Sequence, residues 1–162
     1  MKKLLLVRHC KSGWDEDVFS DFDRKLTNQG IKDGKEMAAI ISKNTPTVHK
    51  IITSSAKRAL TTAKLFADAY SIDCEDITQD KGIYEMDAQY SQNLISRQDS
   101  DNDVILFVGH NPTIVSLAKK LTRQQVSFFD AGGVMLIEFD IEYWNDIITK
   151  PGRIIFYEAP LN

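Results

Sequence analysis

The sequence predicts an α/β fold: a three-layer sandwich in which a mostly parallel central sheet is covered by helices on both faces. Short apolar runs alternate with amphipathic helical patterns along the chain, which is typical of repeated strand and helix units. The 162 residues, 43% of them hydrophobic, suffice for one core. Because no linker or low-complexity tract divides the chain, we expect a single domain over residues 1–162.

The apolar runs are the predicted strands. LLLV opens the first strand, and DVILFV is the strongest strand pattern of the sequence. CEDIT is interpreted as a short edge strand, while GVMLIEF and RIIFYEA are expected to close the sheet on either side of a polar turn with Pro151 and Gly152. The expected strands are residues 3–8, 49–53, 74–78, 103–108, 133–139 and 153–159.

Apolar residues at helical spacing predict the covering helices. The segment 28–43 carries Met37, Ala38 and Ile41 on one side and stops before Pro46. Pro112 is expected at the first position of another helix, where its missing N–H costs nothing. The expected helices are residues 28–43, 57–70, 84–97 and 112–121.

Composition excludes several classes of protein. Net charge is −3, so no basic field favours nucleic acid. The opening MKKLLLV resembles the start of a signal peptide, but its apolar run breaks at Arg8, short of the roughly 7 to 15 residues of such a region. No apolar run approaches the ~20 residues of a membrane helix. Cys10 and Cys74 show neither disulfide nor zinc spacing. We expect a cytoplasmic monomer without membrane contact.

Three predicted strand ends carry reactive or cationic side chains. Arg8 and His9 follow the first strand, Arg58 follows the second in TSSAKRA, and His110 and Asn111 follow the strand 103–108 in GHNP. Ligands of such sheets bind beyond the carboxyl ends of the strands. A lone histidine is usually a structural polar residue, but here two of the three histidines directly follow strands. We therefore expect these side chains to meet at one edge.

Two arginines and two histidines at one place suit a phosphoryl dianion. Guanidinium groups match phosphoryl oxygens bidentately, and an imidazole supplies a nucleophile. The predicted chemistry is in-line attack by His9 on phosphorus, followed by hydrolysis of the phosphorylated histidine. Arg8, Arg58 and His110 would stabilise the charge on the equatorial oxygens. We expect no metal or cofactor, because these side chains already neutralise the phosphoryl charge. Neighbouring arginines would keep His9 neutral.

The motifs in combination are specific. They are RHCKSGW at 8–14, DFDRKLTNQG at 21–30, SSAKRALTTA at 54–63, VGHNPTIVSLA at 108–118 and the glycine pair in DAGGVMLIEF at 130–139. On them the chain resembles the histidine phosphatase superfamily, with its phosphoglycerate-mutase-like fold, and more narrowly the SixA-like phosphohistidine phosphatase branch. The likeness spans nearly the whole chain.

The resemblance implies roles for matching residues. His9 is the phosphate acceptor, Arg8 and Arg58 are phosphate ligands, His110 is the second catalytic histidine, and the backbone of Asn111 is a further phosphate contact.

Two further residues keep alternative interpretations. Arg24 of the DxDRxL element either contacts phosphate or substrate, or braces the loop through an ion pair with Asp21 or Asp23. Ser12 either hydrogen-bonds the anion or caps a turn. The acidic residues between 15 and 23 either chelate a cation or, as is more common, form a solvated or substrate-facing loop.

The chain also departs from the superfamily pattern. Cys10 stands where relatives have glycine or alanine and is interpreted as a small space-filling neighbour. Glu85 in GIYEMD is the plausible counterpart of the general acid of many members, with Asp87 as second choice. The alternative for Glu85 is a solvated helix start. A missing acid would suit phosphohistidine, since imidazole leaves with far less protonation than an alkoxide.

We therefore expect a metal-independent phosphatase that acts on phosphohistidine of a protein partner. A small-molecule phosphomonoesterase and a non-catalytic phosphate-binding module are the alternatives. A cysteine phosphatase is excluded because an arginine is missing six positions after each cysteine, where Glu16 and Asp80 stand. A mutase is disfavoured because the segments between strands leave no room for a lid.

Overall fold

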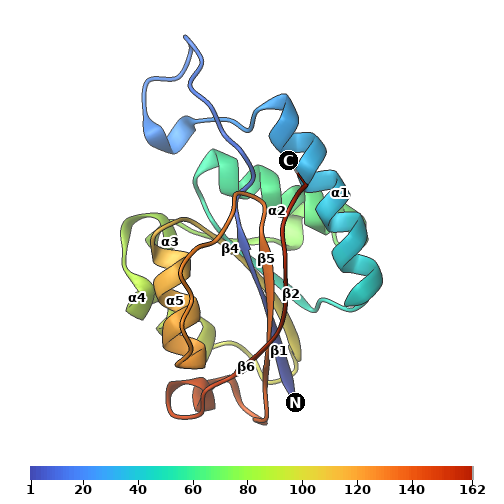
Figure 1. Ribbon diagram of the computed structural model, residues 1–162, viewed down its shortest axis with the longest axis vertical. Helices are drawn as coiled ribbons and strands as arrows, with labels where there is room; N and C mark the ends of the chain where they lie inside the picture. Colours follow the sequence, from blue (N-terminus) through green and yellow to red (C-terminus); the bar gives the residue numbers. More distant parts are fainter. Residues whose placement is uncertain (162) are drawn as a thin grey trace.

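The computed structural model describes residues 1–161, which form a six-stranded sheet (Figure 1). The strand order is β3-β2-β4-β1-β5-β6. The first four strands in this order are parallel, whereas β5 is antiparallel to both β1 and β6. The strands are β1 (Lys2–Arg8), β2 (Lys50–Ser54), β3 (Thr78–Asp80), β4 (Val104–Gly109), β5 (Val134–Phe139) and β6 (Arg153–Glu158).

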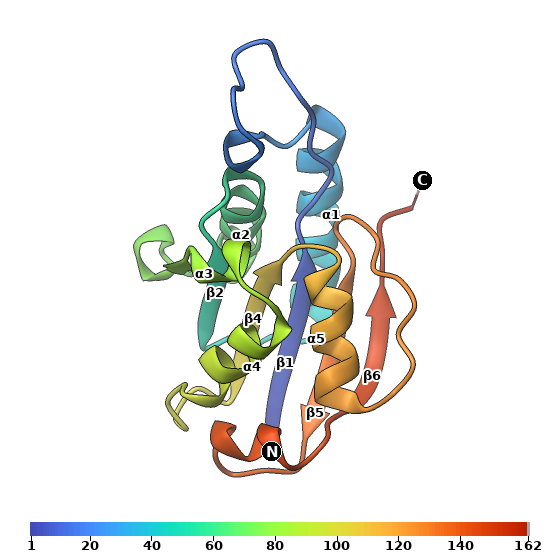
Figure 2. The same ribbon diagram turned by 90° about the vertical axis from the view of Figure 1, so that its left-hand side faces the viewer.

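Helices cover both faces of the sheet, as predicted. In Figure 2, α3, α4 and α5 lie in front of the sheet, with α1 and α2 behind it. The helices are α1 (Asn28–Asn44), α2 (Lys57–Ala69), α3 (Gly82–Glu85), α4 (Ala88–Ser96) and α5 (Thr113–Thr122). Three 3-10 turns lie in the loops of the described chain: η1 (Asp21–Asp23), η2 (Cys74–Asp76) and η3 (Trp144–Ile148). No helix in residues 1–161 has the length and apolar character needed to cross a membrane.

The two cores follow from the alternation of side chains along β1. Leu4 and Leu6 are fully buried in the core beneath α4 and α5. Leu5 and Val7 are fully buried in the opposite core beneath α1 and α2. Because both faces of the strand are covered, its apolar residues are continuous rather than alternating. This packing fixes the direction of β1 and delivers the residues after it to the carboxyl edge.

The boundaries differ from the predictions in two places where polar side chains cap local turns. The predicted strand 74–78 is strand only at its last residue: Asp73 accepts a hydrogen bond from the Glu75 N–H and caps η2, so that β3 begins at Thr78. The predicted helix 84–97 is two helices. Its break is fixed by Asp87, whose side chain accepts from the Tyr90 N–H at 3.1 Å and caps α4.

Two smaller differences concern the C-terminal half. The polar turn before β6 contains η3, whose Trp144 is buried and donates its indole N–H to the Asn102 carbonyl at 2.7 Å. Pro112 precedes α5 as its N-cap instead of occupying its first turn.

Candidate active site

A pocket of about 450 Å³ opens at the carboxyl edge of the parallel strands. It brings together groups from the three strand ends predicted from the sequence and from the loop between β1 and α1. Its lining residues are Arg8, His9, Lys11, Ser12, Asp21, Arg24, Arg58, His110, Asn111 and Ala131. The four residues of the predicted chemistry therefore share one pocket.

His9 follows β1 directly and is held in an orientation suited to attack. Its Nδ1 lies 2.7 Å from the backbone oxygen of Cys10. Because a carbonyl can only accept, Nδ1 carries the ring hydrogen and Nε2 has a free lone pair. Burial lowers the pKa of His9 to about 4, with the positive charges of Arg58 and Arg8 adding to the effect. His9 is therefore neutral at pH 7, as a nucleophile requires.

His110 lies beside His9, with ring centroids 5.2 Å apart. Its Nε2 is 2.7 Å from the Ser54 hydroxyl, which accepts a hydrogen bond from the Ala56 N–H at 3.2 Å. The hydroxyl can donate its own hydrogen to Nε2, and in that tautomer Nδ1 carries the ring proton. Burial lowers the pKa of His110 to about 3. His110 is therefore neutral at pH 7, not a cation.

The two arginines leave buried donors free at the pocket. Arg8 donates through Nη1 to the Phe129 carbonyl at 2.9 Å, and Arg58 donates through Nη1 and Nη2 to Asp21 at 2.6 and 2.9 Å. The Nε atoms of both arginines and Nδ1 of His110 are buried without a hydrogen-bond partner in residues 1–161. Unpaired buried donors are costly, and three in one pocket indicate a site for an anion.

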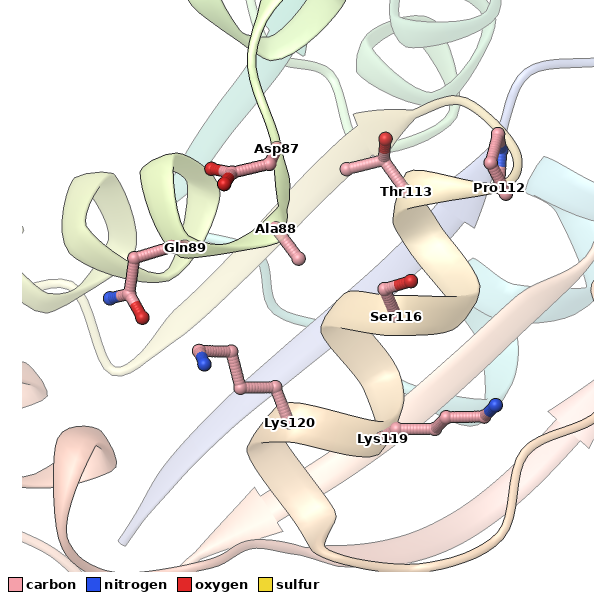
Figure 3. Close-up of a pocket in the computed structure, with 8 residues that line it drawn as sticks. All are labelled: Asp87, Ala88, Gln89, Pro112, Thr113, Ser116, Lys119 and Lys120. Atoms are coloured by element: carbon pink, nitrogen blue, oxygen red, sulfur yellow. The ribbon is translucent and has the colours of Figure 1, made fainter.

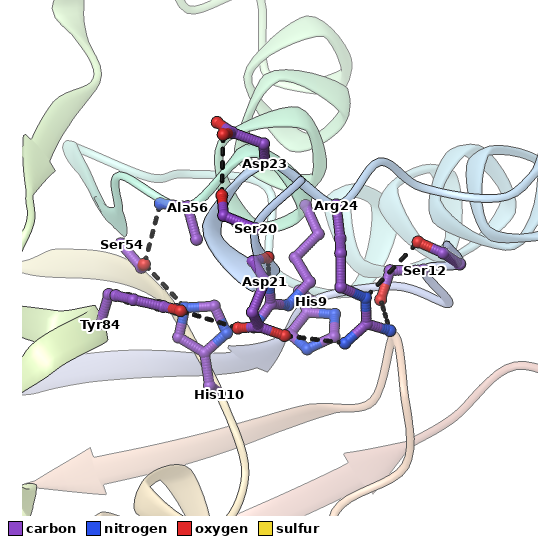
Figure 4. A network of polar contacts seen from close by, with 12 residues as sticks. His9, Ser12, Ser20, Asp21, Asp23, Arg24, Ser54, Ala56, Tyr84 and His110 are labelled. Atoms are coloured by element: carbon purple, nitrogen blue, oxygen red, sulfur yellow. Dashed lines mark hydrogen bonds and ion pairs between the residues drawn. The ribbon is translucent and has the colours of Figure 1, made fainter. Parts of the chain in front are cut away.

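Arg24 and Ser12 form the side of the pocket next to η1 (Figure 4). Arg24 pairs with Asp21 through Nη1 at 3.0 Å and donates through Nη2 to the Ser12 hydroxyl at 3.0 Å. Asp23 accepts instead from Ser20 at 2.8 Å. The structure thus shows the loop-bracing ion pair with Asp21. Both Arg24 and Ser12 still face the pocket, so a contact with bound phosphate remains a prediction.

Asn111 and Glu85 have different surroundings. Asn111 lines the pocket, and its side-chain amide donates to the same Phe129 carbonyl as Arg8, at 3.1 Å. Glu85 is exposed, pairs with Lys81 at 3.5 Å and is absent from the pocket lining. The structure therefore does not bring Glu85 to the phosphate pocket.

Asp87, the second choice for a general acid, lies on another hollow of about 530 Å³ between α4 and α5 (Figure 3). The lining residues described for this hollow include no histidine or arginine. They are Asp87, Ala88, Gln89, Pro112, Thr113, Ser116, Lys119 and Lys120. The groups of the predicted chemistry thus lie in the smaller pocket.

The sequence interpretation missed Tyr84. Its hydroxyl donates to Asp21 Oδ2 at 2.8 Å, and its ring meets the His110 ring edge-on at a centroid distance of 5.6 Å. The Arg58 guanidinium lies 5.8 Å from the centroid of the same ring. A single tyrosine next to a candidate acid gives no sequence signal. Only the packing of α3 against η1 reveals the contact.

Cys10 and the glycine pair support the end of β1 from behind. Cys10 is fully buried, and burial raises the pKa of its thiol to about 11, so the thiol stays protonated. Gly132 donates its N–H to the carbonyls of both Arg8 and His9 at 3.1 Å. Its φ of +78° lies in the left-handed region that favours glycine. These contacts agree with a space-filling role for Cys10.

Comparison with protein families decides the affiliation. The model described as "Histidine phosphatase superfamily (branch 1)" matches residues 4–95. The chain belongs to the histidine phosphatase superfamily. This confirms the family resemblance that the motifs at Arg8, His9 and Arg58 indicated.

Two curated relatives match different shares of the chain. An uncharacterised chloroplast protein of Arabidopsis thaliana is 28% identical over 159 residues, covering 93% of this chain and 72% of the relative. A 2,3-bisphosphoglycerate-dependent phosphoglycerate mutase of Dichelobacter nodosus is 37% identical over 79 residues, covering 48% of this chain and 32% of the mutase.

Solved structures confirm the predicted fold. A candidate phosphohistidine phosphatase SixA of Agrobacterium tumefaciens matches with a TM-score of 0.83 and 23% identity over 98% of both chains. The protein histidine phosphatase SixA complexed with tungstate matches with a TM-score of 0.76 and 18% identity over 98% of this chain and 97% of that one. A mycobacterial glucosyl-3-phosphoglycerate phosphatase complexed with VO3 matches with a TM-score of 0.75 and 13% identity. The match covers 98% of this chain and 100% of that one. The histidine phosphatase fold is thus shared with phosphatases of different substrates.

Proposed function

We propose that this protein is a metal-independent phosphatase that forms a phosphohistidine intermediate on His9 and removes the phosphoryl group from phosphohistidine of a protein partner. One observation carries the proposal. Buried donors on Arg8, Arg58 and His110 without protein partners line the same pocket as a neutral imidazole with a free Nε2. Membership of the histidine phosphatase superfamily supports the same chemistry.

In the first step, His9 Nε2 attacks phosphorus in line. The bond from phosphorus to the leaving atom breaks, and its electron pair goes to that atom. Nε–H of Arg8 and Arg58 and Nδ1–H of His110, which lack partners in the described chain, would bind equatorial oxygens, where preorganised donors stabilise the developing charge. The hydrogen bond from Nδ1 to the Cys10 carbonyl keeps the ring oriented and stabilises its positive charge after phosphorylation.

In the second step, water attacks the phosphorus of the phosphorylated His9, and a bond forms between the water oxygen and phosphorus. The bond between phosphorus and His9 Nε2 breaks, the electron pair returns to Nε2, and the water proton remains on the released phosphate. The same three donors serve this step because the phosphoryl group has moved only from one axial partner to the other. The ring then returns to its neutral form.

The acid–base properties of the pocket support phosphohistidine as substrate. Asp21 is the sole carboxylate among the pocket-lining residues of the described chain, and its pKa is about 2, so it has no proton to donate at neutral pH. An ester needs protonation of its leaving alkoxide, whereas imidazole leaves readily as a neutral ring. A protein-borne phosphoramidate therefore fits this pocket better than an alkyl phosphate.

The test is turnover in the presence of EDTA. Parent protein, His9→Ala and His49→Ala are incubated with a phosphohistidine-bearing protein and with p-nitrophenyl phosphate. His49 is the matched control because it lies at the other end of the sheet, where its Nδ1 accepts from the Val104 N–H. We expect the parent and His49→Ala to dephosphorylate phosphohistidine and to form an acid-labile phosphoenzyme, and His9→Ala to do neither.

Two results would contradict the proposal, and each would support a different function. Turnover of p-nitrophenyl phosphate without turnover of phosphohistidine would identify a small-molecule phosphomonoesterase. If neither substrate is hydrolysed while His9→Ala binds inorganic phosphate as tightly as the parent, the protein is a phosphate-binding module.

A further inference from the structure

Three donors hold the carboxylate of Asp21 at the pocket. Arg58 Nη2 and the Tyr84 hydroxyl donate to Oδ2 at 2.9 and 2.8 Å, and Arg24 Nη1 donates to Oδ1 at 3.0 Å. A carboxylate offers about four acceptor positions. One position on Oδ1 thus stays available, and 43% of the side chain remains exposed. Asp21 can accept one more hydrogen bond from a group that enters the pocket.

The carboxylate is ionised throughout the neutral range. Burial by itself would raise the pKa of Asp21, but hydrogen bonds from Tyr84 and the two arginines outweigh it and lower the pKa to about 2. The negative charge is therefore a fixed feature of a pocket otherwise built for an anion. It acts on whatever is attached to the phosphoryl group.

Asp21 and the proposed nucleophile come from different elements and line the same pocket. His9 directly follows β1, whereas Asp21 belongs to η1 in the loop between β1 and α1. In-line displacement requires the leaving group opposite the attacking nitrogen. Because both residues line one pocket, a leaving group displaced by His9 Nε2 departs within the space that Asp21 borders.

We propose that Asp21 determines substrate specificity by accepting a hydrogen bond from the distal ring N–H of a phosphohistidine and by repelling leaving groups that carry negative charge. This inference rests on the proposed function and deepens it. When His9 attacks, the bond between phosphorus and the substrate ring breaks and the electron pair stays on that ring nitrogen. The reacting form is the ring protonated on its distal nitrogen, which the negative charge of Asp21 favours. The distal nitrogen keeps this proton when the bond to phosphorus breaks, so the ring leaves as neutral imidazole.

The opposite case is a phosphorylated hydroxy acid such as 3-phosphoglycerate. Its carboxylate would approach the ionised Asp21, and like charges at short range in a partly buried site repel each other. Its leaving alkoxide would also find no proton on Asp21. The same residue thus favours one class of substrate and disfavours the other.

The experiment measures kcat/KM for a phosphohistidine peptide and for 3-phosphoglycerate with the parent, Asp21→Asn, Asp21→Glu and Asp23→Asn. Asp23 is the matched control, since it lies on the same turn and bonds to Ser20 rather than facing the pocket. If 3-phosphoglycerate is not turned over, its inhibition constant as a competitor replaces kcat/KM. Thermal unfolding verifies that each variant is folded.

We expect Asp21→Asn to lower kcat/KM for phosphohistidine by about tenfold to a hundredfold, the usual effect of removing a hydrogen bond to a charged group. Activity or affinity toward 3-phosphoglycerate should stay unchanged or rise. Asp21→Glu should keep part of the preference because it keeps the charge, and Asp23→Asn should keep all of it.

An equal loss for both substrates would show that Asp21 only holds Arg58 and Arg24 in place and would overturn the inference while leaving the proposed function intact. An unchanged ratio of kcat/KM between the two substrates in Asp21→Asn would also overturn the inference and leave the proposed function intact. If the parent hydrolyses neither substrate, the proposed function fails, and the role of Asp21 fails with it.

Discussion

Acidification should destabilise the protein through the two histidines of the pocket. The pKa values of His9 and His110 are about 4 and about 3, below the 6.5 of an exposed histidine, chiefly because both rings are buried. Between pH 6.5 and these lower pKa values, the unfolded chain binds protons that the native state does not. With respect to these two rings, the free energy of unfolding therefore has its full value above pH 6.5. It falls progressively as the pH drops toward 4 and 3.

The size of the effect at pH 5 follows from linkage. This pH lies about 1.5 units below the pKa of an unfolded histidine, whereas both native rings are still mostly neutral. At about 1.4 kcal/mol per pH unit this amounts to about 2 kcal/mol for each histidine, or about 4 kcal/mol for the pair. Most single domains are stable by only about 5 to 15 kcal/mol, so the loss is measurable.

The assay is urea unfolding at pH 8 and pH 5 in a buffer without phosphate, because a bound dianion would favour protonated rings. The parent is compared with the double variant His9→Asn/His110→Asn, in which neither position titrates. We expect the parent to lose about 4 kcal/mol more than the double variant between the two pH values. Equal losses would mean that the native rings take up protons as readily as the unfolded chain, and the argument from burial would be refuted.

Three other predictions concern packing and binding. Arg58→Ala should weaken inhibition by inorganic phosphate at least about tenfold, while Lys57→Ala, an exposed neighbour, should change it little. Iodoacetamide should label the exposed Cys74 of the folded protein and leave the buried Cys10 unmodified until urea is added, as mass spectrometry can show. Gly30→Ala should lower the free energy of unfolding by about 1 to 3 kcal/mol in chemical denaturation, because a methyl group there would overlap a backbone oxygen of the loop after β1.

The fold could be predicted because its main strands are buried on both faces. An apolar run such as residues 103–108 has few alternatives to a central strand when helical patterns flank it. The prediction failed at 74–78, where the side chain of Asp73 caps a turn and only a three-residue edge strand follows. Such a strand contributes little burial, so no apolar pattern marks it.

The site could be predicted only in part. Arg8, His9 and His110 were found because the carboxyl ends of strands converge in any parallel sheet. Glu85 kept two interpretations, a general acid or a solvated helix start, and in the structure it is exposed and pairs with Lys81 one helical turn earlier. Its neighbour Tyr84 is the residue of α3 that reaches the site, and nothing local distinguishes the two positions. That choice depends on how α3 packs against η1.

The arrangement of the pocket links its stability to its chemistry. Burial keeps His9 neutral, as the proposed nucleophile must be, and the same burial leaves nitrogens of Arg8, Arg58 and His110 without protein partners in the described chain. Both features raise the free energy of the folded protein, since buried donors and buried titratable rings are costly. A phosphoryl dianion offsets both at once, because its oxygens accept the hydrogen bonds and its charge favours the imidazolium that forms on phosphorylation. Asp21 limits this attraction: its fixed negative charge opposes a second anionic group, so that the pocket accepts the phosphoryl group and discriminates by what is attached to it.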